Sequence, residues 1–148
     1  MPNELLVIED TEVHLAILRK IGAKAGFTTT GADSVEGAAT LLRRRTFDCI
    51  TLDLSLGERS GREVIELLAE LDCRAPILII SGSDDRARDD NVLVATSLGL
   101  VVYPPFPKPV DLVALRQTLQ QIMADTDRQK LAKAIGRVSL LANQLKEL

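Results

Sequence analysis

Short apolar runs alternate with helix-like segments along most of this chain, and this alternation constrains the fold more than any other feature. Each run has four to six residues, mostly Leu, Ile, Val, Phe and Thr, and a segment with helical spacing follows it. Strict alternation of this kind predicts a parallel sheet with helices on both faces and right-handed crossovers. The expected strands are 5–8, 27–30, 47–52, 76–80 and 100–103, and the expected helices 11–25, 35–45, 61–71, 86–98 and 110–124.

Composition places the chain among ordinary globular proteins. Its 148 residues are 46% hydrophobic and 26% charged, which predicts one domain over residues 1–125 and a helical extension over 126–148. A net charge of −3 gives no reason to expect a nucleic-acid partner. The two cysteines, Cys49 and Cys73, lack metal-ligand spacing and indicate a reducing compartment. With neither a leader nor a long apolar run, we expect a cytoplasmic protein that does not bind membranes.

The residues that close the expected strands carry most of the chemistry. Ligands of open parallel sheets bind at the carboxyl ends of the strands. The first strand is followed by Glu9 and Asp10, the third by Asp53, the fourth by Ser81, and Lys108 follows the fifth. Taken singly, Asp10 could cap a helix, Ser81 could belong to a turn, and Lys108 could be a solvated surface residue. Carboxylates clustered together, however, repel one another unless a cation or a proton intervenes.

An acidic cluster beside a hydroxyl and an ammonium group is suited to phosphoryl transfer. Carboxylate oxygens are ligands that Mg²⁺ prefers. A carboxylate can also act as a nucleophile and form an acyl phosphate. The metal and Lys108 would stabilise charge on the transferring oxygens, and Ser81 would donate a hydrogen bond to one of them. The pattern therefore predicts that Asp53 accepts a phosphoryl group.

Five separated motifs occur in a specific order: Glu9-Asp10, Asp53, Gly61 eight residues later, Ser81, and Lys108-Pro109. In this order they resemble the receiver domain of two-component response regulators, over about residues 3–125. The resemblance implies a doubly wound, flavodoxin-like α/β fold with five parallel strands in the order 2-1-3-4-5, followed here by an extra C-terminal helix.

The resemblance also implies roles for these residues. Asp53 would accept the phosphoryl group from the phosphohistidine of a histidine kinase or phosphotransfer protein. Asp10 and Asp53 would bind Mg²⁺ directly, with the backbone carbonyl of Ser55 as a further ligand and Glu9 acting largely through water. Ser81 would move toward the phosphoryl group and Lys108 would pair with it. The Lys108–Pro109 peptide is often cis in this family.

Three positions depart from the family pattern. Gly57 stands where a proline usually follows the phospho-acceptor, which predicts a looser loop. Pro105 replaces the usual switch aromatic, which predicts an atypical output face around the fifth strand. Ser55 and Ser83 are small and uncharged at positions that tune dephosphorylation in the family, which predicts a long-lived phosphoryl state.

The C-terminal segment carries a second pattern. Residues 127–148 hold five basic and two acidic side chains and are too short for a separate output domain. Apolar residues follow a 4-3-4-3 spacing at Leu131, Ile135, Val138, Ala142 and Leu145, which is a short heptad seam. Thr126 or Asp127 could cap this helix. The segment could dock on the receiver, extend the fifth helix or pair with a second copy, and we favour a homodimer; the face around strands four and five is another candidate for self-association.

The leading functional hypothesis is a single-domain response regulator that signals through protein contacts and is not a turnover enzyme. One alternative is a small Mg²⁺-dependent phosphohydrolase with an aspartyl-phosphate intermediate, although Ser55 stands where a second acid or base would favour that reading. Another alternative is a dimerisation module that does not signal. We expect His14, the only histidine in the sequence, to be structural or solvent-facing.

Overall fold

The computed structural model describes residues 3–82 and 85–147. One parallel sheet with strand order β2-β1-β3-β6-β7 forms its centre. This order is the predicted 2-1-3-4-5 topology of the doubly wound fold. The strands of the sheet are β1 (Glu4–Ile8), β2 (Thr28–Ala32), β3 (Cys49–Asp53), β6 (Ile77–Ser81) and β7 (Phe106–Pro107). The helices are α1 (Glu12–Lys24), α2 (Val35–Arg44), α3 (Gly61–Glu70), α4 (Asp85–Ser97) and α5 (Leu112–Lys146).

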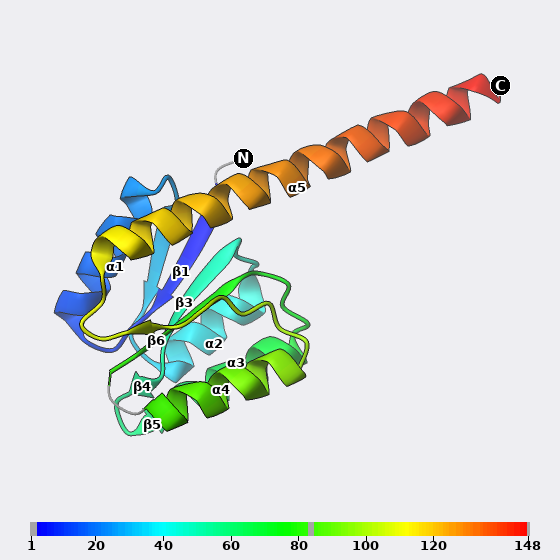
Figure 1. Cartoon of the computed structure of the whole chain (residues 1–148). Helices are drawn as coiled ribbons and strands as arrows, with labels where there is room; N and C mark the ends of the chain where they lie inside the picture. The colour runs from blue at the N-terminus through cyan, green and yellow to red at the C-terminus, as the bar shows by residue number, and fades with distance from the viewer. Residues whose placement is uncertain (1–2, 83–84, 148) are drawn as a thin grey trace.

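Helices cover both faces of the sheet (Figure 1). α1 and the inner part of α5 lie on one face, where their apolar residues pack with Leu5, Val7 and Leu78. α2, α3 and α4 cover the other face, where Leu6, Ile50 and Ile79 lie at the centre of a larger cluster. The central strands are therefore apolar on both sides, which is why their sequences are continuous apolar runs rather than alternating ones.

Several helix boundaries follow the sequence signals. The Ser34 side chain accepts a hydrogen bond from the Gly37 N–H and so caps the start of α2. Gly26 follows α1 with φ of +109°, a left-handed conformation that ends the helix at little cost for glycine. Ser60 caps α3 by accepting from the Arg62 N–H.

The expected fifth strand at residues 100–103 is confirmed only in part. Val102 makes an isolated parallel bridge with Ile77, and regular pairing resumes only at Phe106–Pro107, which lies beside Ile80 and Ser81. Pro104 and Pro105 separate the two contacts, and proline has no N–H to donate to a ladder. The edge strand is therefore interrupted at the two prolines.

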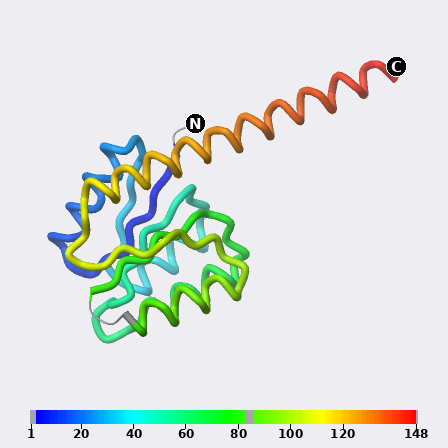
Figure 2. The backbone as a smooth tube through the Cα atoms, viewed as in Figure 1, coloured from blue at the N-terminus to red at the C-terminus, as the bar shows by residue number. Residues whose placement is uncertain are grey.

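Helix α5 is continuous, so the expected cap at Thr126 or Asp127 was wrong. Its inner part buries Leu115, Leu119 and Ile122 against the domain. The Asp127 carboxylate accepts a hydrogen bond of 2.8 Å from the Asn3 side chain, so it ties the helix to the start of β1 instead of capping it. Beyond this point the helix projects away from the domain (Figure 2). Within the described residues, no helix combines the length and apolar character needed to cross a membrane.

Candidate functional site

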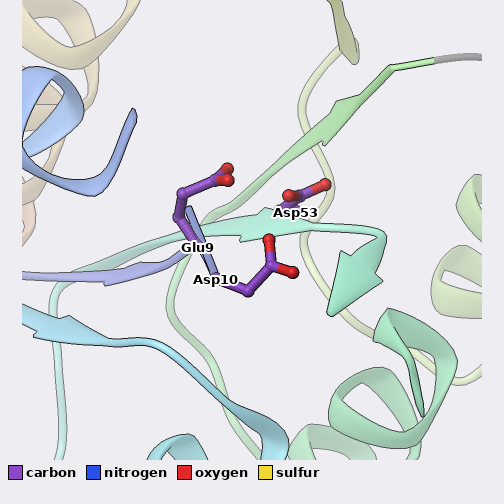
Figure 3. A group of neighbouring side chains, drawn as sticks. All are labelled: Glu9, Asp10 and Asp53. Atoms are coloured by element: carbon purple, nitrogen blue, oxygen red, sulfur yellow. The ribbon is translucent and has the colours of Figure 1, made fainter. Parts of the chain in front are cut away.

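Three carboxylates converge at the carboxyl edge of the sheet (Figure 3). Glu9 and Asp10 directly follow β1, and Asp53 is the last residue of β3. Because β1 and β3 pair in parallel with Ile8 opposite Leu52, the residues that follow lie at the same level. Carboxylate oxygens of Glu9, Asp10 and Asp53 all lie within 4.8 Å of one another. The predicted convergence of these strand ends is therefore confirmed.

Lys108 reaches into this cluster from the loop after β7. Its Nζ atom lies 3.1 Å from Asp53 Oδ2 and 3.5 Å from Glu9 Oε2. Its backbone N–H donates to the carbonyl of Ser81 at 2.9 Å, which fixes the lysine beside the end of β6. The Lys108–Pro109 peptide is cis, as expected.

Burial makes the electrostatics of the site strong. The Asp53 residue is 2% exposed and Glu9 is fully buried. Burial and, next, the neighbouring charge of Asp53 raise the pKa of Glu9 from 4.5 to about 7. Burial alone would lower the pKa of Lys108, but its hydrogen bond to Asp53 and the charges of Asp53 and Glu9 outweigh this and raise it. These shifts favour a proton on Glu9 below about pH 7 and a charged ammonium on Lys108.

Backbone groups of the following loop orient two of the carboxylates. The Ser55 N–H donates to Asp53 Oδ1 at 3.1 Å, and the Gly57 N–H donates to Asp10 Oδ2 at 2.8 Å. The start of α3 then approaches the end of β3 very closely. A Cβ atom at Gly61 would lie only 2.9 Å from the backbone oxygen of Asp53, so a side chain there would displace backbone. This contact explains why glycine stands eight residues after Asp53.

The loop after Asp53 is a short hairpin rather than the looser loop expected from Gly57. β4 (Ser55–Leu56) pairs antiparallel with β5 (Arg59–Ser60). Gly57 has φ of +65° at the turn, a value that the ring of a proline excludes. Arg59 holds the hairpin on the domain through ion pairs with Glu36 and Glu63.

The remaining candidate residues lie around the cluster. Ser81 ends β6 and is buried, one residue beyond Ile80, which pairs with Asp53. Pro105 is half-buried at the interruption of the edge strand. Tyr103 and Phe106, the nearest aromatics, pack against the α1 and α5 side of the core. Ser83 lies outside the described residues.

Sequence reasoning missed one neighbour of the site. The His14 side chain is 53% exposed, as expected, yet its Nδ1 atom lies 3.8 Å from Glu9 Oε1. It also lines a largely apolar cavity of about 500 Å³, together with Glu9, Lys108 and residues of α1 and α5. The signal available in the sequence was its place one helical turn after Asp10.

The donor set fits a hard divalent cation. All donors in the cluster are oxygens, one of the three carboxylates (Asp10) is exposed to solvent, and the other two are buried. Mg²⁺ typically takes one or two carboxylates and keeps several waters, which requires such a half-open arrangement. The residues present are therefore compatible with Mg²⁺.

Comparison with known proteins identifies relatives of this chain. A family model described as the response regulator receiver domain matches residues 5–120. The transcriptional regulatory protein ZraR of Salmonella typhimurium is 26% identical over 123 residues, or 83% of this chain and 27% of that protein. The alginate biosynthesis transcriptional regulatory protein AlgB of Pseudomonas aeruginosa is 29% identical over 118 residues, or 78% of this chain and 26% of AlgB. The chain thus spans about a quarter of the length of these curated relatives.

Solved structures agree on the fold. A response regulator from Colwellia psychrerythraea is 24% identical with a TM-score of 0.71, and the match covers 86% of this chain and 99% of that one. A response regulator protein from Burkholderia pseudomallei, with a phosphorylated aspartic acid, calcium ion and citrate, is 26% identical with a TM-score of 0.65. That match covers 88% of this chain and 74% of the other.

Proposed function

This chain belongs to the response regulator receiver family, and from that premise we propose that it is a phosphorylation-controlled signalling domain with Asp53 as the phospho-acceptor. The single observation that carries the proposal is the position of Asp53 at the tip of a buried strand. It lies within reach of two further carboxylates and 3.1 Å from the ammonium group of Lys108. This constellation supports phosphoryl transfer better than a structural role, because buried like charges are unfavourable without a ligand.

In the proposed reaction, an Asp53 carboxylate oxygen attacks the phosphorus of a phosphohistidine on a histidine kinase or phosphotransfer protein. An O–P bond forms as the N–P bond breaks, and the imidazole nitrogen leaves with the bonding electron pair and is reprotonated from solvent. Lys108 offsets negative charge on the phosphoryl oxygens. The Ser81 hydroxyl is proposed to donate to one of these oxygens after the transfer.

Glu9, Asp10, Asp53 and the backbone carbonyl of Ser55 would hold Mg²⁺. When bound, the cation supplies positive charge beside the transferring oxygens. The Burkholderia pseudomallei relative, whose structure combines a phosphorylated aspartic acid with a calcium ion, supports this assignment for a related chain. We further propose that Asp53 is phosphorylated and slowly dephosphorylated without turnover of a separate substrate, and that the phosphoryl state changes contacts with a protein target.

Incubation with acetyl phosphate and Mg²⁺ tests the proposal. Intact-mass measurement should show one added phosphoryl group that hydroxylamine removes, because acyl phosphates are cleaved by this reagent. The Asp53→Asn variant should show no addition, whereas Asp33→Asn, which removes an exposed carboxylate, should label like the wild type. Equal labelling of Asp53→Asn and the wild type would refute the assignment. Repeated turnover of a generic phosphate ester would instead indicate the phosphohydrolase.

A further inference from the structure

The outer part of α5 projects from the domain (Figure 2). It exposes a stripe of apolar side chains. We define the seam as the large apolar residues of this stripe, which are those of the heptad pattern except Ala142, together with Leu141 beside it. Each is more than half exposed, which is unusual for so many large aliphatic side chains on adjacent turns. The seam consists of Leu131 (60% exposed), Ile135 (57%), Val138 (66%), Leu141 (58%) and Leu145 (68%).

We propose that the seam is a homodimer interface at which two copies of this chain pair their α5 helices in a parallel, two-stranded coiled coil. The spacing of the apolar residues along the helix supports pairing with a second helix. Leu131, Val138 and Leu145 are seven residues apart, and Ile135 lies between them in 4-3 spacing. A repeat of 3.5 residues suits a second, similar helix wound around this one, whereas packing on an unrelated flat surface needs only the 3.6 period.

The seam and the buried residues of α5 lie on different faces of the helix. In the inner part of the same helix, Leu115, Leu119 and Ile122 face the domain and are buried. With about 100° per residue along a continuous helix, the mean direction of the seam lies about 130° around the axis from these residues. The seam therefore faces away from the protomer's own domain. The extension cannot fold back to bury it without breaking α5, and a second copy can approach it without meeting that domain.

The residues beside the seam do not hinder the approach of a second helix. Ala132, Ala134 and Ser139 border the seam and allow close approach of a second helix. The basic residues Lys133 and Arg137 lie outside these positions, so two copies do not place like charges directly opposite each other. Between Leu131 and Leu145 the helix therefore lacks the charge pattern that would oppose self-association.

The heptad positions of the seam residues and the area that they would bury both fit an interface between two helices. Ile135 occupies an a position, and Leu131, Val138 and Leu145 occupy d positions. In parallel coiled coils, a β-branched residue at a with leucine at d favours two strands. Since the domains lie on the outer sides of the two helices, both can occupy the same end. At roughly 100 Å² per apolar side chain, the five seam residues of two copies would bury about 1,000 Å², which reaches the area of a specific interface.

Sedimentation equilibrium of the 148-residue chain, without Mg²⁺ or phosphodonor, tests the proposal separately from the proposed function. The wild type should be dimeric at about 100 μM and dissociate on dilution. The double variant Ile135→Asp, Val138→Asp should weaken association at least 100-fold. The matched control Gln129→Asp, Asn143→Asp, on the opposite face, should dimerise like the wild type. A wild type that stays monomeric, or a seam variant that dimerises normally, would overturn the proposal.

Disulfide trapping tests the orientation in a Cys73→Ser background, in which the remaining Cys49 is fully buried. In a parallel pair each residue at an a or d position meets its own copy, so Leu131→Cys and Leu145→Cys, both at d, should each form covalent dimers under mild oxidation. In an antiparallel pair centred on Val138, only Val138→Cys would do so. Crosslinking at Val138→Cys alone would therefore overturn the parallel arrangement.

Discussion

The carboxyl edge of the sheet and the outer part of α5 depart from ordinary burial in opposite directions. At the edge, the acidic side chains of Glu9 and Asp53 are buried, whereas on the outer helix large aliphatic residues such as Val138 and Leu145 are exposed. Either departure is unfavourable unless something compensates for it. At the edge, Lys108 supplies compensation from within the chain. On the helix, we infer that the compensation comes from a second chain.

The two regions also differ in how their geometry is held. The acidic cluster sits on strand ends fixed by the parallel ladder of β1 and β3. The seam sits on a single helix whose outer residues are exposed, and an isolated helix of this length is only marginally stable in water. The acidic cluster can therefore be preorganised in one protomer, whereas the order of the seam depends on association with a second copy. Four predictions follow from this contrast, in decreasing order of expected effect.

Replacement of single leucines of α5 by alanine should show the largest difference in stability between its inner and outer parts. Leu119→Ala removes a fully buried side chain and should lower the free energy of unfolding by about 2–5 kcal/mol. Leu140→Ala removes a side chain that is 59% exposed and lies off the seam, and should cost less than about 0.5 kcal/mol. Urea unfolding measures both variants. Equal losses would mean that the outer helix packs on its own domain.

The buried acid Glu9 should make stability depend on pH when Mg²⁺ is absent. Its folded-state pKa is raised to about 7 by burial and the charge of Asp53, so the folded state binds more protons than the unfolded state between about pH 4.5 and 7. The contribution of Glu9 is therefore fully present below pH 4.5 and is lost as the pH rises through 7, by up to about 3 kcal/mol.

Urea unfolding in EDTA at several pH values checks this prediction. The Glu9→Gln variant cannot ionise at this position, so its stability relative to the wild type should rise across the same window. Parallel pH profiles of the two proteins would contradict a raised pKa at Glu9.

Removal of the exposed carboxylate of the cluster should weaken Mg²⁺ binding. Asp10→Asn should lower the affinity at least tenfold, or by about 1.4 kcal/mol, because a charged ligand becomes neutral. Amide chemical shifts of Asp53 and Ser55 during a Mg²⁺ titration provide the measurement. Asp33→Asn, which removes a carboxylate outside the cluster, is the matched control, and an unchanged affinity in Asp10→Asn would place the cation elsewhere.

The ion pair at the point where α5 leaves the domain should contribute least to the free energy of unfolding. Lys130 pairs with Asp48 at 3.2 Å at the point where α5 leaves the domain. Since this lysine is 45% exposed, Lys130→Ala should cost only about 0.2–1 kcal/mol, and the loss should shrink at high salt. Hydrogen exchange of the amides around residue 127 should detect the local opening, with Lys133→Ala as the control. A loss that does not depend on salt would indicate packing rather than an ion pair.

Much of the site could be predicted because its residues follow strands whose type is evident locally. Once the apolar runs are assigned to one parallel sheet, their carboxyl ends share an edge, and Glu9, Asp53 and Lys108 must come together. The fifth strand could not be located in this way. The run at residues 100–103 pairs with β6 only at the Val102–Ile77 bridge, because Pro104 and Pro105 interrupt pairing, and the regular pairing with β6 lies at Phe106–Pro107.

The sequence by itself therefore determined the fold class and the members of the acidic cluster, because periodicity and strand-end position are local properties. Only the tertiary structure decided that α5 runs through Thr126 and Asp127 without a break. The Asp127 carboxylate has two competing partners, the helix N–H groups nearby and the Asn3 amide, and the folded chain brings the second within 2.8 Å. Because the helix is continuous, its period places the seam on a different face from the residues that α5 buries against its own domain.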